Sequence, residues 1–253
     1  MSPNRTHPKV TSRRQAVSAS RWRKRFQVLG ICLGVSAIFA GLAYLLQTPT
    51  FRVQDVEVSG ALHTPTAEIL AASQLGDHPT MVLLDSAAVA QGIERLAWIE
   101  LVDVQRHWPH KVTLVVHERN PVAALMRKDG SFVLADQSGR LLQNVTDPGG
   151  LPSVARVQSV GKPGSSVGAP SLAALKVAAR LPVAFKAQVI GVDVTAKGNV
   201  RLRLNSPVAV QLGQAVHLPA KFAALAAVLA GAPLHPGDVV DVSVPSTPVV
   251  KGP

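Results

Sequence analysis

The longest uninterrupted apolar stretch of the chain is residues 26–46, where 21 mostly hydrophobic residues carry no charge. A helix of that length measures about 31 Å, enough to cross a hydrocarbon core of roughly 30 Å. The alternative is a cleaved signal peptide, whose apolar part usually has about 7–15 residues and ends in an Ala-x-Ala-like site. Because Ala37, Ala40 and Ala43 are spaced by three, the pattern favours a retained transmembrane helix over 26–46, between a tail at 1–25 and a linker at 47–50.

After the linker, the pattern predicts a strand, two helices and two strands within residues 51–119. In the first strand the apolar residues switch from odd to even positions, which predicts a bulge near Gln54 and Asp55. Thr64 is expected to cap the first helix, and Asp85 or Ser86 the second. Three strands with two helices on one face form a small α+β domain. The predicted strands cover 51–58, 101–106 and 111–119.

From residue 120 onward, Gly-containing turns separate short runs of alternating apolar and polar residues, as in a mostly antiparallel sheet. Two helices interrupt these runs, one over 171–181 and one that starts at Pro219 and closes at Gly231. The fold class is therefore α+β: a single N-terminal transmembrane helix, a small three-stranded α+β domain at 51–119 and a larger β domain at 120–244. The predicted strands of the larger domain are 122–126, 132–134, 140–142, 189–194, 200–204, 208–212 and a last one at 240–244, before an extended tail at 245–253.

The net charge of +11 is concentrated in the tail before the apolar stretch. Residues 1–25 hold eight bases and no acid, whereas the rest of the chain has 18 bases and 15 acids. Bases beside a membrane span stay in the cytoplasm, so the tail is expected inside and the C-terminal part outside. The tail contains no folded domain that could recognise nucleotides, so we expect it to contact anionic lipid and not nucleic acid. The bases that set this orientation are Arg21, Arg23, Lys24 and Arg25.

No motif of a catalytic site is found in the sequence. It contains no Gly-x-Ser-x-Gly, no His-Glu-x-x-His and a single cysteine, Cys32, inside the apolar stretch. His107 and His110 flank a turn, but no further metal ligands can be assigned to them. We therefore expect no enzyme activity, no metal and no cofactor, and a membrane-tethered hydrolase is disfavoured.

The chain carries, in this order, FRVQDVEVSG at 51–60, VQRHWP at 104–109, VVHERNPVA at 115–123, VQLG at 210–213, Lys221 at the head of its helix, and VDVSVP at 240–245. Together these segments resemble the FtsQ/DivIB family of bacterial cell-division proteins. They lie behind the basic tail and single anchor, and the resemblance covers nearly the whole chain after residue 20. It implies a POTRA domain at 51–119 and a β domain from 120, with Glu118, Arg119 and Pro121 at the junction.

The resemblance also implies a non-enzymatic role at the division septum of the cell membrane, as a single-pass type II protein. Its expected partners are FtsB-like (DivIC-like) and FtsL-like bitopic proteins, together with other divisome members that include septal peptidoglycan synthases. The family receives FtsB at its C-terminal sheet edge and on the neighbouring helix. On this chain that implies Lys221 and Phe222, with the strand residues Val240, Asp241, Val242, Ser243 and Val244.

Two alternatives stay open. Pro245 and Pro248 follow the last strand, and proline cannot donate to a β-ladder. The receiving edge therefore ends at Val244 in this interpretation, and an ordinary terminal strand blunted by prolines is the competing one. A POTRA-bearing component of protein export or outer-membrane assembly is the alternative function. The short strands disfavour it, since a membrane barrel needs strands of about ten residues.

Overall fold

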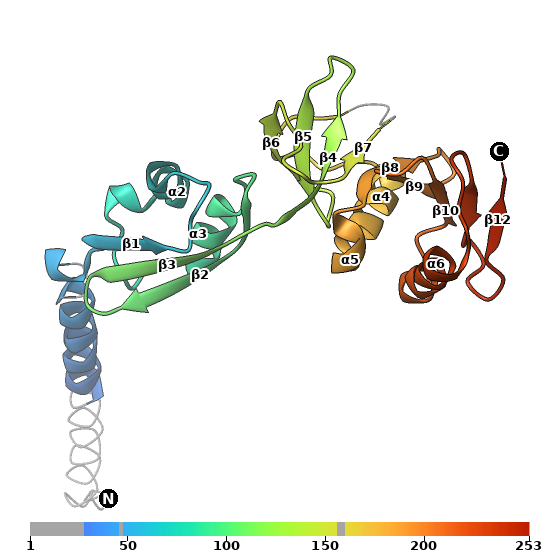
Figure 1. Ribbon diagram of the computed structural model, residues 1–253. Helices are drawn as coiled ribbons and strands as arrows, with labels where there is room; N and C mark the ends of the chain where they lie inside the picture. Colours follow the sequence, from blue (N-terminus) through green and yellow to red (C-terminus); the bar gives the residue numbers. More distant parts are fainter. Residues whose placement is uncertain (1–27, 46–47, 156–159, 253) are drawn as a thin grey trace, which may run out of the picture. The chain divides into compact units, whose positions relative to one another are not determined.

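The computed structural model describes residues 28–45, 48–155 and 160–252 (Figure 1). Several sequence-based predictions fall outside these residues: the basic tail with Arg21, Arg23, Lys24 and Arg25, both ends of the apolar stretch, Gln47 and Pro253. The described part of the apolar stretch forms one exposed helix, Val28–Leu45, with a mean hydropathy of 2.2. Among the described residues it is the one helix long and apolar enough to cross a membrane.

By their internal contacts, residues fall into two compact units. The first contains the N-terminal helix and the chain up to Val56, together with residues 78–84 and 106–112. The second contains residues 57–77, 85–105 and 113–253. The predicted domain boundaries at 50/51 and 119/120 follow a different criterion and stay predictions.

A three-stranded sheet with the strand order β1-β3-β2 is formed within residues 55–118. The predicted irregularity is present at the start of its first strand, where the N–H groups of Gln54 and Asp55 both donate to the carbonyl of His110, at 2.9 and 3.3 Å. The regular strand therefore begins at Asp55 and not at the predicted Phe51. The elements up to this point are η1 (Pro49–Phe51), β1 (Asp55–Ser59), α2 (Thr66–Ser73), η2 (Leu75–Asp77), α3 (Ser86–Ile93), β2 (Ile99–His107) and β3 (Lys111–Glu118).

One of the two predicted helix caps is correct. Asp85 accepts hydrogen bonds from the N–H groups of Ala87 and Ala88 at 3.0 and 3.1 Å and so caps α3. The prediction for Thr64 is wrong, because α2 starts one residue later than expected and its N-cap is Pro65. Pro65 has no side-chain acceptor, and its carbonyl receives the first amides of the helix instead.

The larger sheet has nine strands in the order β12-β11-β10-β9-β8-β7-β4-β5-β6. Most neighbours are antiparallel, but β4–β7, β7–β8 and β10–β11 are parallel pairs. Its elements are β4 (Pro121–Met126), β5 (Phe132–Asp136), β6 (Leu141–Val145), β7 (Ser153–Val154), α4 (Ala169–Ala179), α5 (Val183–Lys186), β8 (Val189–Val194), β9 (Val200–Leu204), β10 (Ala209–Gly213), α6 (Leu218–Gly231), β11 (Val239–Asp241) and β12 (Val249–Lys251).

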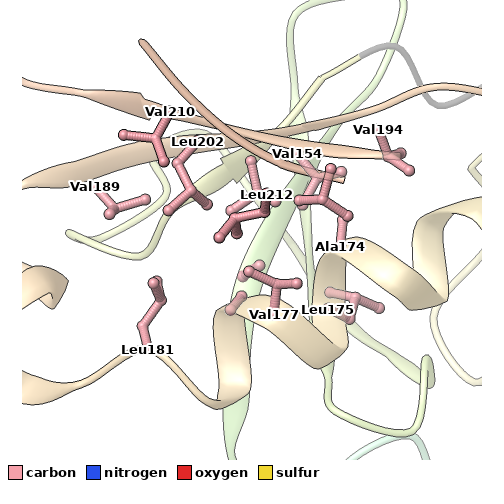
Figure 2. Close-up of a cluster of buried hydrophobic side chains, with 14 of the residues drawn as sticks. Val154, Ala174, Leu175, Val177, Leu181, Val189, Val194, Leu202, Val210 and Leu212 are labelled. Atoms are coloured by element: carbon pink, nitrogen blue, oxygen red, sulfur yellow. The ribbon is translucent and has the colours of Figure 1, made fainter. Parts of the chain in front are cut away.

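The core of this part lies between the sheet and its helices. In Figure 2, Leu175 and Val177 of α4 point toward Leu202 and Leu212 of the sheet above them. All four side chains are completely buried. Truncating one such residue to alanine typically costs about 2–5 kcal/mol, so this layer fixes where the strands at the C-terminal side of the sheet lie.

Candidate partner-binding edge

The end of the nine-stranded sheet differs from the prediction. The strand expected over 240–244 is regular only at Val239–Asp241, and it pairs in parallel with β10, with Val240 opposite Val210. On its other side it pairs antiparallel with β12, where Val240 lies opposite Val250. The predicted edge strand is therefore an inner strand, and the edge is β12 (Figure 1).

The chain reaches β12 through a turn that contains Pro245 and is followed by Pro248. The N–H of Thr247 donates to the carbonyl of Val244 at 3.2 Å, and β12 starts directly after Pro248. A proline at the start of a strand removes no ladder donor from the strand itself. Within the tail that was predicted to be extended, residues Val249–Lys251 form a strand that is paired with β11.

A charged pair holds β12 against β11. The Nζ of Lys251 lies 3.3 Å from Oδ2 of Asp241. The N–H of Ser243 donates to Oδ1 of the same carboxylate at 3.0 Å. A hydrogen bond from the side chain of Ser243, and after it those from the Ser243 N–H and from Lys251, lower the pKa of Asp241 below its usual value against the opposing effect of partial burial. The carboxylate is therefore charged at neutral pH and keeps its contact with Lys251.

Lys221 lies beneath this end of the sheet and is only 2% exposed. Its Nζ donates to the carbonyls of Leu212 and Gln214 at 2.7 and 2.9 Å. Burial lowers the pKa of the ammonium group, and the nearby charge of Asp241 opposes that shift. Lys221 therefore ties the end of β10 to α6, and its side chain is not presented to solvent.

The predicted site residues thus separate by exposure. Phe222, Val240 and Val242 are at most 4% exposed, and the Phe222 ring lies 6.3 Å from that of Phe185. Asp241 and Ser243 are half-buried, and Val244 is 55% exposed. The surface residues that the sequence did not assign are Val249 and Val250 of β12, which are 47% and 39% exposed. The short apolar pair after Pro248 was the only sequence signal for them.

The predicted junction residues lie at a dense set of polar contacts in the second unit. Glu118 accepts hydrogen bonds from the N–H groups of His63 and Thr64, and its Oε2 lies 2.8 Å from Nδ1 of His63. Arg119 contacts Asp136 at 2.7 Å. Pro121 opens β4 opposite Asp136. Glu118 therefore ties the end of β3 to the segment before α2, and Arg119 ties the β3–β4 connection to the end of β5.

Among the described residues, no group of three or more His, Cys, Asp and Glu side chains is placed to hold a metal ion. The described fold is that of a chain with one apolar N-terminal helix, a small three-stranded α+β part and a larger, mostly antiparallel nine-stranded sheet. Two family models match the chain in sequence. The POTRA domain of FtsQ type matches residues 51–119, and the C-terminal region of the cell division protein FtsQ/DivIB matches residues 124–243.

Several relatives that are named cell division protein FtsQ match most of the chain. The protein of Streptomyces collinus is 32% identical, with 92% of each chain covered. That of Streptomyces venezuelae is 30% identical over 89% of this chain and 84% of its own. That of Mycolicibacterium smegmatis is 28% identical over 99% of this chain and 69% of its own. The chain belongs to the FtsQ/DivIB family of cell-division proteins.

Proposed function

We propose that this protein is a membrane-anchored assembly protein of the divisome, which links early and late division proteins and helps to control septal peptidoglycan synthesis. Family membership supports the role in division, and the apolar helix Val28–Leu45 supports a single membrane span. In this proposal the basic tail is cytoplasmic, the remainder is extracytoplasmic, and the protein concentrates at the septum. It acts by binding and not by catalysis.

The observation that carries the proposal is the position of β12 at the end of the nine-stranded sheet. A terminal strand presents backbone N–H and C=O groups on one side, to which an extended peptide can add as a further strand. The exposed side chains of Val249 and Val250 would contact apolar residues of that peptide. We propose an FtsB-like (DivIC-like) protein as this partner, with an FtsL-like protein and the septal synthases joining through it.

The originally expected residues keep a role in this proposal, but a different one. Lys221, Phe222, Val240 and Val242 would act by holding β10, β11 and α6 in place beneath the edge, since all four are buried. Asp241 and Ser243 would fix β12 on β11, and only Val244 would be free to touch the partner through its side chain.

Proline substitutions in β12 test the edge. Consecutive residues of a strand turn their N–H groups to opposite sides, so one of Val249 and Val250 faces β11 and the other faces outward. We expect one of Val249→Pro and Val250→Pro to abolish co-purification of the FtsB-like partner while the free energy of unfolding stays unchanged. The other should loosen β12 itself. Alanine at the same positions is the matched control, because it keeps the N–H.

The outcome that contradicts the edge assignment is partner binding that survives both proline variants. Localisation is tested separately with a fluorescent fusion to the N-terminus in dividing cells. A band at mid-cell is expected, and uniform membrane fluorescence would contradict the proposed divisome role without bearing on the edge.

A further inference from the structure

The N-terminal helix enters the fold through two successive turns. The N–H and hydroxyl of Thr48 both donate to the carbonyl of Leu45, at 3.1 and 2.6 Å. The N–H of Phe51 then donates to the carbonyl of Thr48 at 3.0 Å. Fully extended, the six residue-to-residue steps from Leu45 to Phe51 would span about 20 Å. Since the path is turned, Phe51 lies closer to the end of the helix than that.

Phe51 and its neighbours are bonded to two segments distant in the sequence. The N–H of Met81 donates to the carbonyl of Phe51 at 2.8 Å, and that of Val53 donates to Pro79 at 3.0 Å. The ring of Phe51 lies 6.2 Å from that of Trp108. Residues 78–84 and 106–112 consequently form one compact unit with the helix.

These two segments present apolar side chains to solvent. Leu83, Trp108 and Val82 are 76%, 55% and 44% exposed, whereas Met81 and Leu84 are buried. The cause is a turn in which the N–H of Leu83 donates to Thr80, so a run of four apolar residues faces inward at its ends and outward in its middle. A single exposed leucine needs no explanation. Three large exposed apolar side chains in the unit that contains the N-terminal helix do need one. We call these residues, Val82, Leu83 and Trp108, the anchor-proximal patch.

The segments that carry this patch also hold basic residues. Within residues 48–56, 78–84 and 106–112 the sequence has Arg52, Arg106 and Lys111 against one acid, Asp55. Arg52 and Arg106 are exposed, and Nη1 of Arg106 donates to the carbonyl of Leu84 at 3.3 Å. Apolar side chains with a tryptophan among bases match the interfacial layer of a bilayer, where aromatic rings lie at headgroup level and bases meet anionic lipid.

We propose that the anchor-proximal patch inserts into the interfacial layer of the membrane beside the span. This inference rests on the membrane anchoring proposed above. The interfacial layer is about 5–8 Å thick on each side of the hydrocarbon core, so the short turned connection from Leu45 brings the patch within its reach. The protein then contacts the bilayer twice, through the span and through this surface, and residues 48–56, 78–84 and 106–112 cannot turn freely about the span.

A spin label read for depth tests this contact. Cys32 is the single cysteine, so Cys32→Ala gives a background for one label at a time in the full chain. The protein is placed in vesicles of phosphatidylethanolamine and phosphatidylglycerol. We expect a label at Leu83→Cys to collide more with dissolved oxygen than with an aqueous nickel chelate, as labels at headgroup depth do. Leu62→Cys, an exposed leucine of the second unit (87%), is the matched control.

Three outcomes separate the possibilities. Loss of most nickel collisions at Leu83→Cys but not at Leu62→Cys supports the proposal, and Trp108→Ser should then restore collisions at Leu83→Cys. Equal nickel access at both positions in vesicles overturns it. If the label at Leu83→Cys is protected from nickel collisions in native membranes but not in pure lipid vesicles, the proposal is overturned in favour of a protein partner. A label at Phe39→Cys within the helix reports anchoring independently, and nickel access there would refute the anchor itself.

Discussion

Nη1 of Arg119 lies 2.7 Å from Oδ2 of Asp136, and the two side chains are only 15% and 5% exposed. Each partner is held by further bonds. Nε of Arg119 donates to the carbonyl of Ile99 at 3.0 Å, and Oδ1 of Asp136 accepts from the N–H groups of Ser138 and Arg140. This pair therefore joins the start of β2 to the turn between β5 and β6.

We expect Arg119→Ala to lower the free energy of unfolding by about 2–4 kcal/mol, since it leaves a buried carboxylate without its cation. The measurement is urea unfolding of the full chain in mild detergent. Asp193→Ala is the control, because Asp193 pairs with Arg203 at 3.2 Å where both side chains are about one-third exposed. Its cost should stay below about 1 kcal/mol. Equal costs for the two variants would contradict the importance given to burial.

Acid should weaken the same region. Burial raises the pKa of Asp136, but hydrogen bonds from Arg119, Ser138 and Arg140 outweigh it and hold the pKa below its usual value. Burial likewise raises the pKa of Glu118, but hydrogen bonds from His63 and Thr64 outweigh this effect and hold the pKa below its usual value. The folded state then binds fewer protons than the unfolded one. The stability from both groups is present above the unfolded pKa values of about 4 and is lost as pH falls through the folded ones.

Urea midpoints measured from pH 7 to pH 3 would check this sign. The midpoint should hold above about pH 5 and fall below about pH 4. The fall should be smaller in Asp136→Asn, which already lacks the charge at pH 7. A variant that follows the parent curve in parallel at every pH would show that Asp136 does not contribute to the acid sensitivity.

Gly60 and Gly130 offer a matched pair for backbone strain. Both have positive φ, at 85° and 84°. A Cβ on Gly60 would collide with the carbonyl oxygen of Val116, whereas one on Gly130 would meet open space. Gly130→Ala should cost about 1–2 kcal/mol for its dihedral alone, and Gly60→Ala about 3 kcal/mol or more. Thermal unfolding of both variants decides the matter, and similar losses would mean that β3 yields easily at Val116.

Lys221→Met should cost about 1–3 kcal/mol, because the carbonyls of Leu212 and Gln214 lose their buried donor. Lys176→Met on α4 is the control, since Lys176 is exposed and a surface change there should stay within about 0.5 kcal/mol. Hydrogen exchange along β10 and β11 gives a second readout. In Lys221→Met we expect faster amide hydrogen exchange confined to these strands. Unchanged exchange would show that Lys221 does not hold them in place.

The sequence predicted the elements that have a clear periodicity of their own. The runs 189–194 and 200–204 coincide with β8 and β9. In the second run, five alternating residues already specify which face is buried. The family resemblance, carried by motifs such as VVHERNPVA, agrees with the two matching family models. Local patterns were therefore sufficient for the fold class and the family.

What the sequence did not reveal depends on long-range pairing. β7 has two residues and β12 three, too few for any alternation to be recognised, and they exist as strands only because neighbouring strands supply hydrogen-bond partners. The burial of Lys221 was also hidden, since a lysine at the head of a helix usually lies in solvent. The edge of the sheet was placed at 240–244 because β12 was too short to be recognised, although the neighbouring helix α6 and strand β11 were predicted.

The two residues of β7 have a mechanical consequence. Strands β4, β5 and β6 form one part of the sheet, called here a plate, and β8 to β12 form another. Only β7 joins the two plates and forms the seam between them. It has two residue pairs with β4 and a single pair, Ser153 with Gly191, with β8. The hydroxyl of Ser153 reinforces that seam by donating to Ile190 and accepting from Arg203. When opposing loads act on the two plates, the sheet should tear first along Ser153 and Val154, with each plate still intact.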